Sequence, residues 1–116
     1  MNESILDSVK DFLDIPVEES ETYFDAQLII HINTFLRRLN QIGVGVENFS
    51  ITSNAQKWSD FLLNEDKYKQ AKEYVFLRTK QIFDPPTNSS ASKAYDDVIK
   101  ELETLMYWDA DNELED

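Results

Sequence analysis

The sequence predicts an all-α fold, a small helical bundle of four to five helices. Apolar residues recur at spacings of three and four over several long stretches, as on the buried side of a helix. The chain has two glycines and three prolines, and they stand where these stretches end. Its 116 residues, 41% of them hydrophobic and 29% charged, are enough for one folded domain.

The first predicted helix lies between Asn2, a candidate N-cap, and Pro16. Proline disfavours the α conformation in the residue before it, so the helix should end before Pro16. Its apolar positions are Ile5, Leu6, Val9, Phe12 and Leu13.

The second predicted helix, in "DAQLIIHINTFLRRLNQIG", shows the clearest periodicity. Thr22 followed three residues later by Asp25 resembles a capping box, and Gly43 stands where a left-handed C-terminal cap is expected. The apolar stripe consists of Leu28, Ile32, Phe35, Leu39 and Ile42, widened by Ile29 and Leu36.

The middle of the chain predicts an extended loop, "VGVENFSIT", then a short helix around "NAQKWSDFLL" with Trp58 in the core. Asn64 is the expected N-cap of the fourth helix, "DKYKQAKEYVFLRTKQIF". The stripe predicted for this helix is Tyr68, Ala71, Val75 and Ile82, broadened by Tyr74 and Phe83.

Asp84-Pro85-Pro86 ends the fourth helix and acts as a rigid joint, because two prolines fix two φ angles. Ser89 or Ser90 should cap the last helix, which either packs back on the bundle or leaves it as an arm. Its predicted stripe is Ala94, Tyr95, Val98, Leu102 and Leu105, with Ile99 and Met106 alongside. The final "DADNELED" holds five acids and is expected to fray. We therefore expect one helical domain over residues 1–108 and an acidic tail over 109–116.

Charge is distributed unevenly. The net charge of −12 divides into −7 over residues 1–25 (one base, eight acids), +3 over 26–80 (eight bases, five acids) and −8 over 81–116 (two bases, ten acids). This balance disfavours tight binding to nucleic acid or anionic membrane. It fits solvated helix faces, or a basic middle that meets the acidic end of another subunit.

Several classes of protein are excluded or disfavoured. The absence of cysteine excludes a disulfide scaffold, a thiolate zinc site and a cysteine nucleophile. No apolar run reaches the roughly 18 residues of a membrane span, and the acidic N-terminus does not resemble a signal peptide. His31, the single histidine, has no ligand or base partner at helical spacing, so we expect a structural histidine and no enzyme, metal or cofactor.

Two doublets have open interpretations. Arg37-Arg38 suits either phosphate contact or a solvated, ion-pairing helix face. Tyr107-Trp108 is either a docking anchor, since these residues dominate interface hot spots, or a cover over the end of the bundle.

Taken together, the chain resembles the small helical head–tail connector (adaptor, or head-completion) proteins of tailed bacteriophages, particularly phages of Gram-positive bacteria. The resemblance rests on "FDAQLIIHINTFLRRLNQIGVG", "FSIT" followed by "WSDFL", "YVFLRTKQIFDPPTNS" and a final helix of the type "VIKELE". The acidic tail after Trp108 departs from the pattern. The motif and joint residues are Phe83, Asp84, Pro85, Pro86 and Trp58.

The resemblance implies a structural virion protein in the neck, assembled in the host cytoplasm. Its subunits would form a ring, a dodecamer in the virion, beneath the portal protein. The ring would extend the DNA channel without binding DNA specifically and would provide a platform for the stopper or tail-completion protein. No cofactor, catalytic step or membrane is implied.

Two sets of contact residues follow as hypotheses. The C-terminal segment would engage the portal through Leu105, Tyr107, Trp108, Asp109 and Asp111. Neighbouring subunits would pair bases with acids from the set Lys67, Lys69, Lys72, Arg78, Lys80, Asp7, Asp11, Asp96 and Asp97.

The sequence leaves two other functions open: an acidic DNA-mimic inhibitor, and a helical interaction module of another assembly. The basic middle of the chain counts against the DNA mimic, which would space acids along one face like phosphates.

Overall fold

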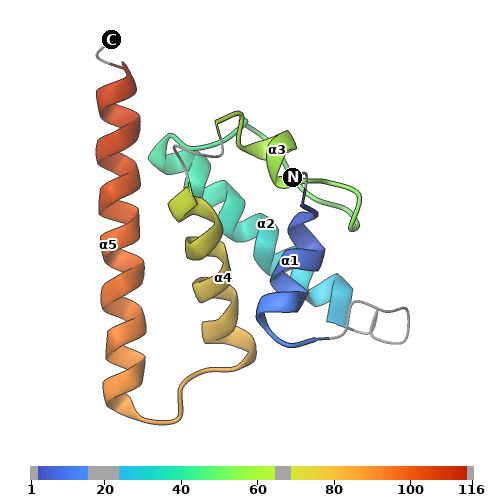
Figure 1. Cartoon of the computed structure of the whole chain (residues 1–116), viewed down its shortest axis with the longest axis vertical. Helices are drawn as coiled ribbons and strands as arrows, with labels where there is room; N and C mark the ends of the chain where they lie inside the picture. Colours follow the sequence, from blue (N-terminus) through green and yellow to red (C-terminus); the bar gives the residue numbers. More distant parts are fainter. Residues whose placement is uncertain (1–2, 16–23, 65–68, 115–116) are drawn as a thin grey trace.

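The fold was analysed in a computed structural model, which describes residues 3–15, 24–64 and 69–114, the last four as backbone. Within these ranges the chain forms helices and no strand, which confirms the predicted all-α bundle. The helices are α1 (Ile5–Phe12), α2 (Asp25–Ile42), α3 (Trp58–Phe61), α4 (Lys69–Phe83) and α5 (Ser89–Leu114), as Figure 1 shows.

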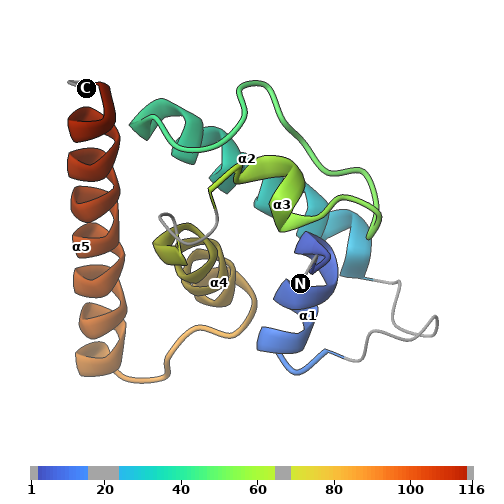
Figure 2. The same cartoon turned by 45° about the horizontal axis from the view of Figure 1, so that its top comes forward.

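Helices α1, α2 and α4 pack against one another around the core, while α5 lies along α4 and reaches α2 (Figures 1 and 2). The predicted stripe of α2 is confirmed: Leu28, Ile32, Phe35, Leu39 and Ile42 are all buried. Gly43 ends α2 with φ 107°, the left-handed cap that the sequence predicts.

The N-terminal caps differ from the predicted ones. Ser4, and not Asn2, caps α1, because its hydroxyl accepts a hydrogen bond from the Asp7 amide at 3.2 Å. Asn88 caps α5 by accepting from the Ala91 amide at 2.8 Å, so Ser89 and Ser90 lie inside the helix. At α2 the N-cap position is occupied by Phe24, whose side chain makes no capping hydrogen bond.

Other cap predictions fall beside gaps in the description. Asn2 and Thr22 lie outside the described residues, and so does Tyr68, a predicted stripe residue of the fourth helix. Asn64 lies in the described part, five residues before α4 begins at Lys69.

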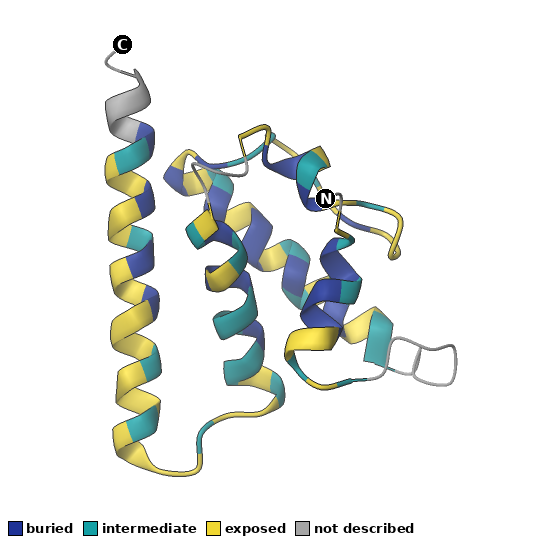
Figure 3. Ribbon diagram, in the orientation of Figure 1, coloured by how far each residue is buried: buried dark blue, intermediate teal, exposed yellow. Residues whose placement is uncertain are grey.

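The buried side of α5 is rotated from the predicted stripe. Ala94 is exposed, and Val98 and Leu105 are 39% and 44% exposed. Figure 3 shows the buried residues along one side of the helix, and these are Ile99, Leu102, Met106 and Ala110. The sequence contains two neighbouring apolar stripes. Packing selects the stripe that ends in Ala110. This small residue packs closely against Gly43: a Cβ added to Gly43 would lie 3.0 Å from the Ala110 Cβ.

The last turns of α4 also differ from the prediction. Ile82 is exposed, whereas Thr79 is buried. The Thr79 hydroxyl donates to the Val75 carbonyl oxygen at 2.7 Å, so this polar group is satisfied within its own helix and can face the core.

The joint at residues 84–88 turns the chain back, and α5 runs antiparallel to α4 (Figure 1). Of the two alternatives for the last helix, the structure shows the first: α5 packs back on the bundle through buried residues from Ile99 to Ala110. The predicted fraying is wrong for residues 109–114, because α5 continues as a helix to Leu114. Its C-terminal end projects past α2 and α3 (Figure 1).

Candidate interaction surfaces

A polar cluster joins the three longest helices. The Tyr74 hydroxyl of α4 donates to Glu103 Oε2 of α5 at 2.6 Å, and Arg78 donates to the Tyr74 hydroxyl oxygen at 2.7 Å. Arg38 of α2 lies 3.3 Å from Glu103 Oε1. The cluster therefore holds α5 at a defined angle to α2 and α4, which supplements the two prolines of the joint.

The electrostatics of this cluster follow from burial and charge. Burial, then the hydrogen bond to Glu103, raises the pKa of Tyr74 to about 12. Burial opposes ionisation of Glu103. Hydrogen bonds from Tyr74 and Arg38, with the charges of Arg38 and Arg78, outweigh it and lower the Glu103 pKa. The carboxylate is therefore ionised at neutral pH.

A second buried pair fixes α1 against α2. Lys10 is 1% exposed, and its Nζ lies 2.8 Å from Asp25 Oδ1. Sequence reasoning missed this pair, although Lys10 follows the buried positions of α1 directly. Trp58 is fully buried, as predicted, and its Nε1 donates to Ser8 Oγ at 2.9 Å.

The motif residues of the joint make local contacts. Phe83 meets the ring of His31 edge-on at 5.6 Å, so the half-buried histidine packs as the structural residue that the sequence predicts. Asp84 pairs with Lys80 at 2.8 Å. Pro85 is exposed and Pro86 is half-buried.

The C-terminal candidates, here called the α5 tip, lie in the C-terminal part of α5: Leu105, Tyr107, Trp108, Asp109 and Asp111. Leu105 is 44% exposed. Tyr107 and Trp108 are 61% and 60% exposed, so they do not cover the end of the bundle. Asp109 is half-buried, and Asp111 lies in the helical continuation of α5. Tyr107 also lines a shallow pocket of about 450 Å³ with Arg38, Ile42, Lys100, Glu103 and Thr104.

Most basic candidates for a subunit contact already have partners within the chain. Arg78 belongs to the Glu103 cluster, and Lys80 pairs with Asp84. Lys72 lies 3.9 Å from Glu3 and 5.9 Å from the centre of the Trp58 ring. Lys69 is exposed, and Lys67 lies outside the described residues.

Most acidic candidates for a subunit contact also have partners within the chain. Asp96 accepts from Gln81 at 2.7 Å, and Asp97 pairs with Lys93 at 3.1 Å. Asp7 accepts from Asn54 at 3.4 Å, whereas Asp11 is exposed. The structure thus distributes these charges over several faces and does not gather them into one patch.

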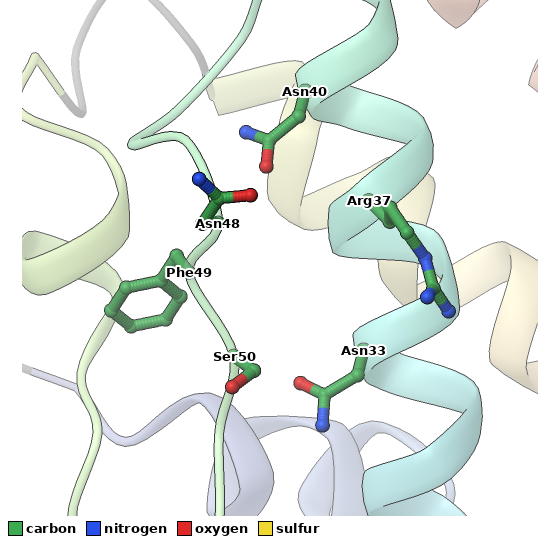
Figure 4. Close-up of a pocket in the computed structure, with 6 residues that line it drawn as sticks. All are labelled: Asn33, Arg37, Asn40, Asn48, Phe49 and Ser50. Atoms are coloured by element: carbon green, nitrogen blue, oxygen red, sulfur yellow. The ribbon is translucent and has the colours of Figure 1, made fainter.

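The solvent-facing side of α2 holds features that sequence reasoning missed. Figure 4 shows a pocket of about 380 Å³ between α2 and the 44–52 loop, lined by Asn33, Arg37, Asn40, Asn48, Phe49 and Ser50. Asn33 exchanges two hydrogen bonds with the Ile51 backbone, at 2.7 and 3.0 Å. Asn40 donates to two further loop carbonyl oxygens. These amides are therefore loop anchors.

The two residues of the Arg37-Arg38 doublet have different environments. Arg38 is the ion-pairing member, through Glu103. Arg37 is exposed, points away from the loop in Figure 4, and has no ion pair among the described residues.

The described residues contain neither a candidate metal site nor a candidate membrane-spanning helix. No group of three or more histidine, aspartate or glutamate side chains is placed to hold a metal ion. None of the described helices combines the length and apolarity needed to cross a membrane.

Comparison with known proteins gives one finding. A family model described as "Phage connector protein" matches residues 5–113, almost the whole chain. Searches of the curated proteins and of the solved structures returned no match. The matched range spans every motif on which the resemblance rests, from the first helix to the acidic end of α5. The chain therefore belongs to the phage connector family, the head–tail connectors that serve as structural components of the virion.

Proposed function

We propose that this connector forms a ring, a dodecamer in the virion, beneath the portal protein of a phage with a Gram-positive host. The ring extends the DNA channel and gives the stopper or tail-completion protein its platform. Assembly takes place in the host cytoplasm. The role is structural, with no catalytic step.

The observation that carries the portal contact is the α5 tip. Tyr107 and Trp108 are large aromatic side chains in the C-terminal part of α5, and both are more than half exposed. Aromatic residues of this kind supply much of the energy of protein interfaces once buried. The Glu103 cluster and the packing of Met106 and Ala110 hold the tip rigidly, so little ordering entropy is lost on docking.

The charge of the chain supports a conduit for DNA. With 23 acids against 11 bases, a ring of many copies repels phosphate. A wall rich in lysine and arginine would instead hold DNA through release of counterions. We therefore expect the channel lining to be electronegative.

The test is sedimentation of the purified chain with the portal ring encoded by the same genome. We expect about one chain per portal subunit in the complex. Replacing Tyr107 and Trp108 by alanine should abolish co-sedimentation. The matched control is Leu63→Ala, which removes a side chain that is 87% exposed but lies outside α5.

Two results would refute parts of the proposal. No association between the wild-type chain and a well-formed portal ring would refute the connector position. Equal association of the double-alanine variant and the Leu63 control would refute the α5 tip as the contact.

A further inference from the structure

The solvent-facing side of α2 carries arginine and no acid. Its exposed residues between Ile30 and Gln41 are Ile30, Thr34, Arg37, Arg38 and Gln41, here called the α2 face. Asp25 is the one acid in α2, and it forms an ion pair with Lys10. In a chain of net charge −12, this face is a local region of positive charge.

The α2 face is also hollowed on both sides of Arg37. One hollow is the pocket beside the 44–52 loop (Figure 4). The other, of about 310 Å³, is lined by Thr34, Phe35, Arg37, Arg38, Gln41 and Arg78. Three arginines line this second hollow, and Glu103 is the one acid paired with any of them among the described residues. The hollow therefore has unbalanced positive charge.

The solvent-facing side of α1 has the opposite charge. Asp7 and Asp11, four residues apart, lie on the same side of α1. Glu3 and Asp14 flank the helix at its two ends, and Glu3 lies 3.9 Å from Lys72 of α4. We call these four acids the α1 face. The single base of α1, Lys10, is buried on the other side against Asp25. Asp11 and Asp14 are exposed and have no ion pair among the described residues.

The two faces cannot neutralise each other within one chain. Helices α1 and α2 contact each other through their core sides, which carry Ile5, Val9, Leu28 and Ile32. Each charged face is the side of its helix away from that core. A protein contact that pairs the two faces would therefore involve two molecules.

We propose that this other molecule is a second copy of the chain, and that the α2 face of one copy binds the α1 face of the next. This inference rests on the ring of the proposed function, because a ring needs two different surfaces on every subunit. Charge complementarity selects the pairing: the arginine face carries no acid, and on the acidic face Asp11 and Asp14 have no ion pair among the described residues. Exposed charge pairs of this kind mainly set orientation, while apolar contacts such as those of Ile30 add affinity.

The test uses two charge reversals at exposed positions without ion pairs, Arg37→Glu and Asp11→Arg. Each variant alone places like charges across every subunit contact, so we expect self-association to weaken about tenfold. Mixed in equal amounts, the variants can alternate around an even-numbered ring. Every contact then joins opposite charges again, so the mixture should recover assembly.

Sedimentation on the homologous portal ring measures assembly, and thermal unfolding checks that each variant is folded. Glu101→Lys is the matched control, an equal charge reversal at an exposed site on α5 that does not line the pocket of Tyr107 and Arg38. It should assemble like the wild type. Because the chain has no cysteine, a second readout is available: Arg37→Cys mixed with Asp11→Cys should cross-link through a short bis-maleimide, and neither should alone.

The outcomes separate the two proposals. Failure of the wild-type chain to assemble, alone or on the portal, refutes the ring and this contact with it. Normal assembly of wild type and of both reversals refutes the contact and leaves the ring intact. Loss of portal binding in the Arg37 variant without rescue by the Asp11 variant would assign the α2 face to the portal and overturn the subunit contact.

Discussion

Replacing Glu103 by glutamine should reveal how much the polar cluster contributes to holding α5. Glutamine keeps the shape of the side chain but removes the charge that Tyr74, Arg38 and Arg78 share. The bond from the buried Tyr74 hydroxyl is short and charge-assisted, which is worth about 1.5–3 kcal/mol. The ion pair with the half-exposed Arg38 adds at most about 1 kcal/mol. We expect a loss of about 2–3 kcal/mol in the free energy of unfolding at pH 7.

Urea unfolding followed by tryptophan fluorescence measures this loss, since Trp58 is buried in the native state. Asp97→Asn is the matched control, because it breaks the fully solvated pair with Lys93 on the same helix and should cost less than about 0.5 kcal/mol.

The pH dependence gives a second check with a definite sign. The folded-state pKa of Glu103 is lowered, so its contribution is fully present above its ordinary pKa of 4.5 and is lost as pH falls through the folded value. The stability gap between wild type and Glu103→Gln should therefore narrow on acidification below about pH 4.5. A gap under about 0.5 kcal/mol at pH 7, or one that stays constant on acidification, would show that the Glu103 charge does not stabilise the packing of α5.

Three further changes test other contacts. Tyr74→Phe should lose less stability than wild type between about pH 10 and 12, because the raised Tyr74 pKa of about 12 means that wild-type stability falls as pH rises through that range; urea titrations across it measure the two slopes. Gly45→Ala should cost about 2–4 kcal/mol in a thermal melt, since its Cβ would lie 2.2 Å from the Phe61 ring at φ +87°. Asp25→Ala should cost about 2–4 kcal/mol by leaving Lys10 buried without a counter-charge, whereas Lys10→Met should be near neutral in urea unfolding.

The helices with one strong apolar stripe could be predicted from the sequence. In α2, hydrophobic residues at spacings of three and four leave one choice of buried side, and Gly43 ends the helix where a left-handed residue is needed. The family was likewise accessible, because the joint and the α2 stretch keep their order and spacing along the chain.

Positions with two competing local solutions could not be predicted. In α5 the stripes through Val98 and through Ile99 are nearly equivalent in sequence. Asn88, Ser89 and Ser90 are all good N-caps, and hydrogen-bond geometry chose Asn88. The α5 continuation through the acidic residues also depends on context, since Ala110 is held against Gly43.

The helical class, the position of most helices, the loss of positive charge toward both ends and the family could be inferred from the sequence alone. Which polar and charged groups meet depends on the tertiary structure. Lys10 with Asp25, and Tyr74 with Glu103, lie 15 and 29 residues apart, and no local pattern couples such pairs. Helix periodicity specifies which side of a helix is buried, but the partner across the core depends on how all the buried sides fit together at once. The opposite charges of the α1 and α2 faces are a consequence of that fit.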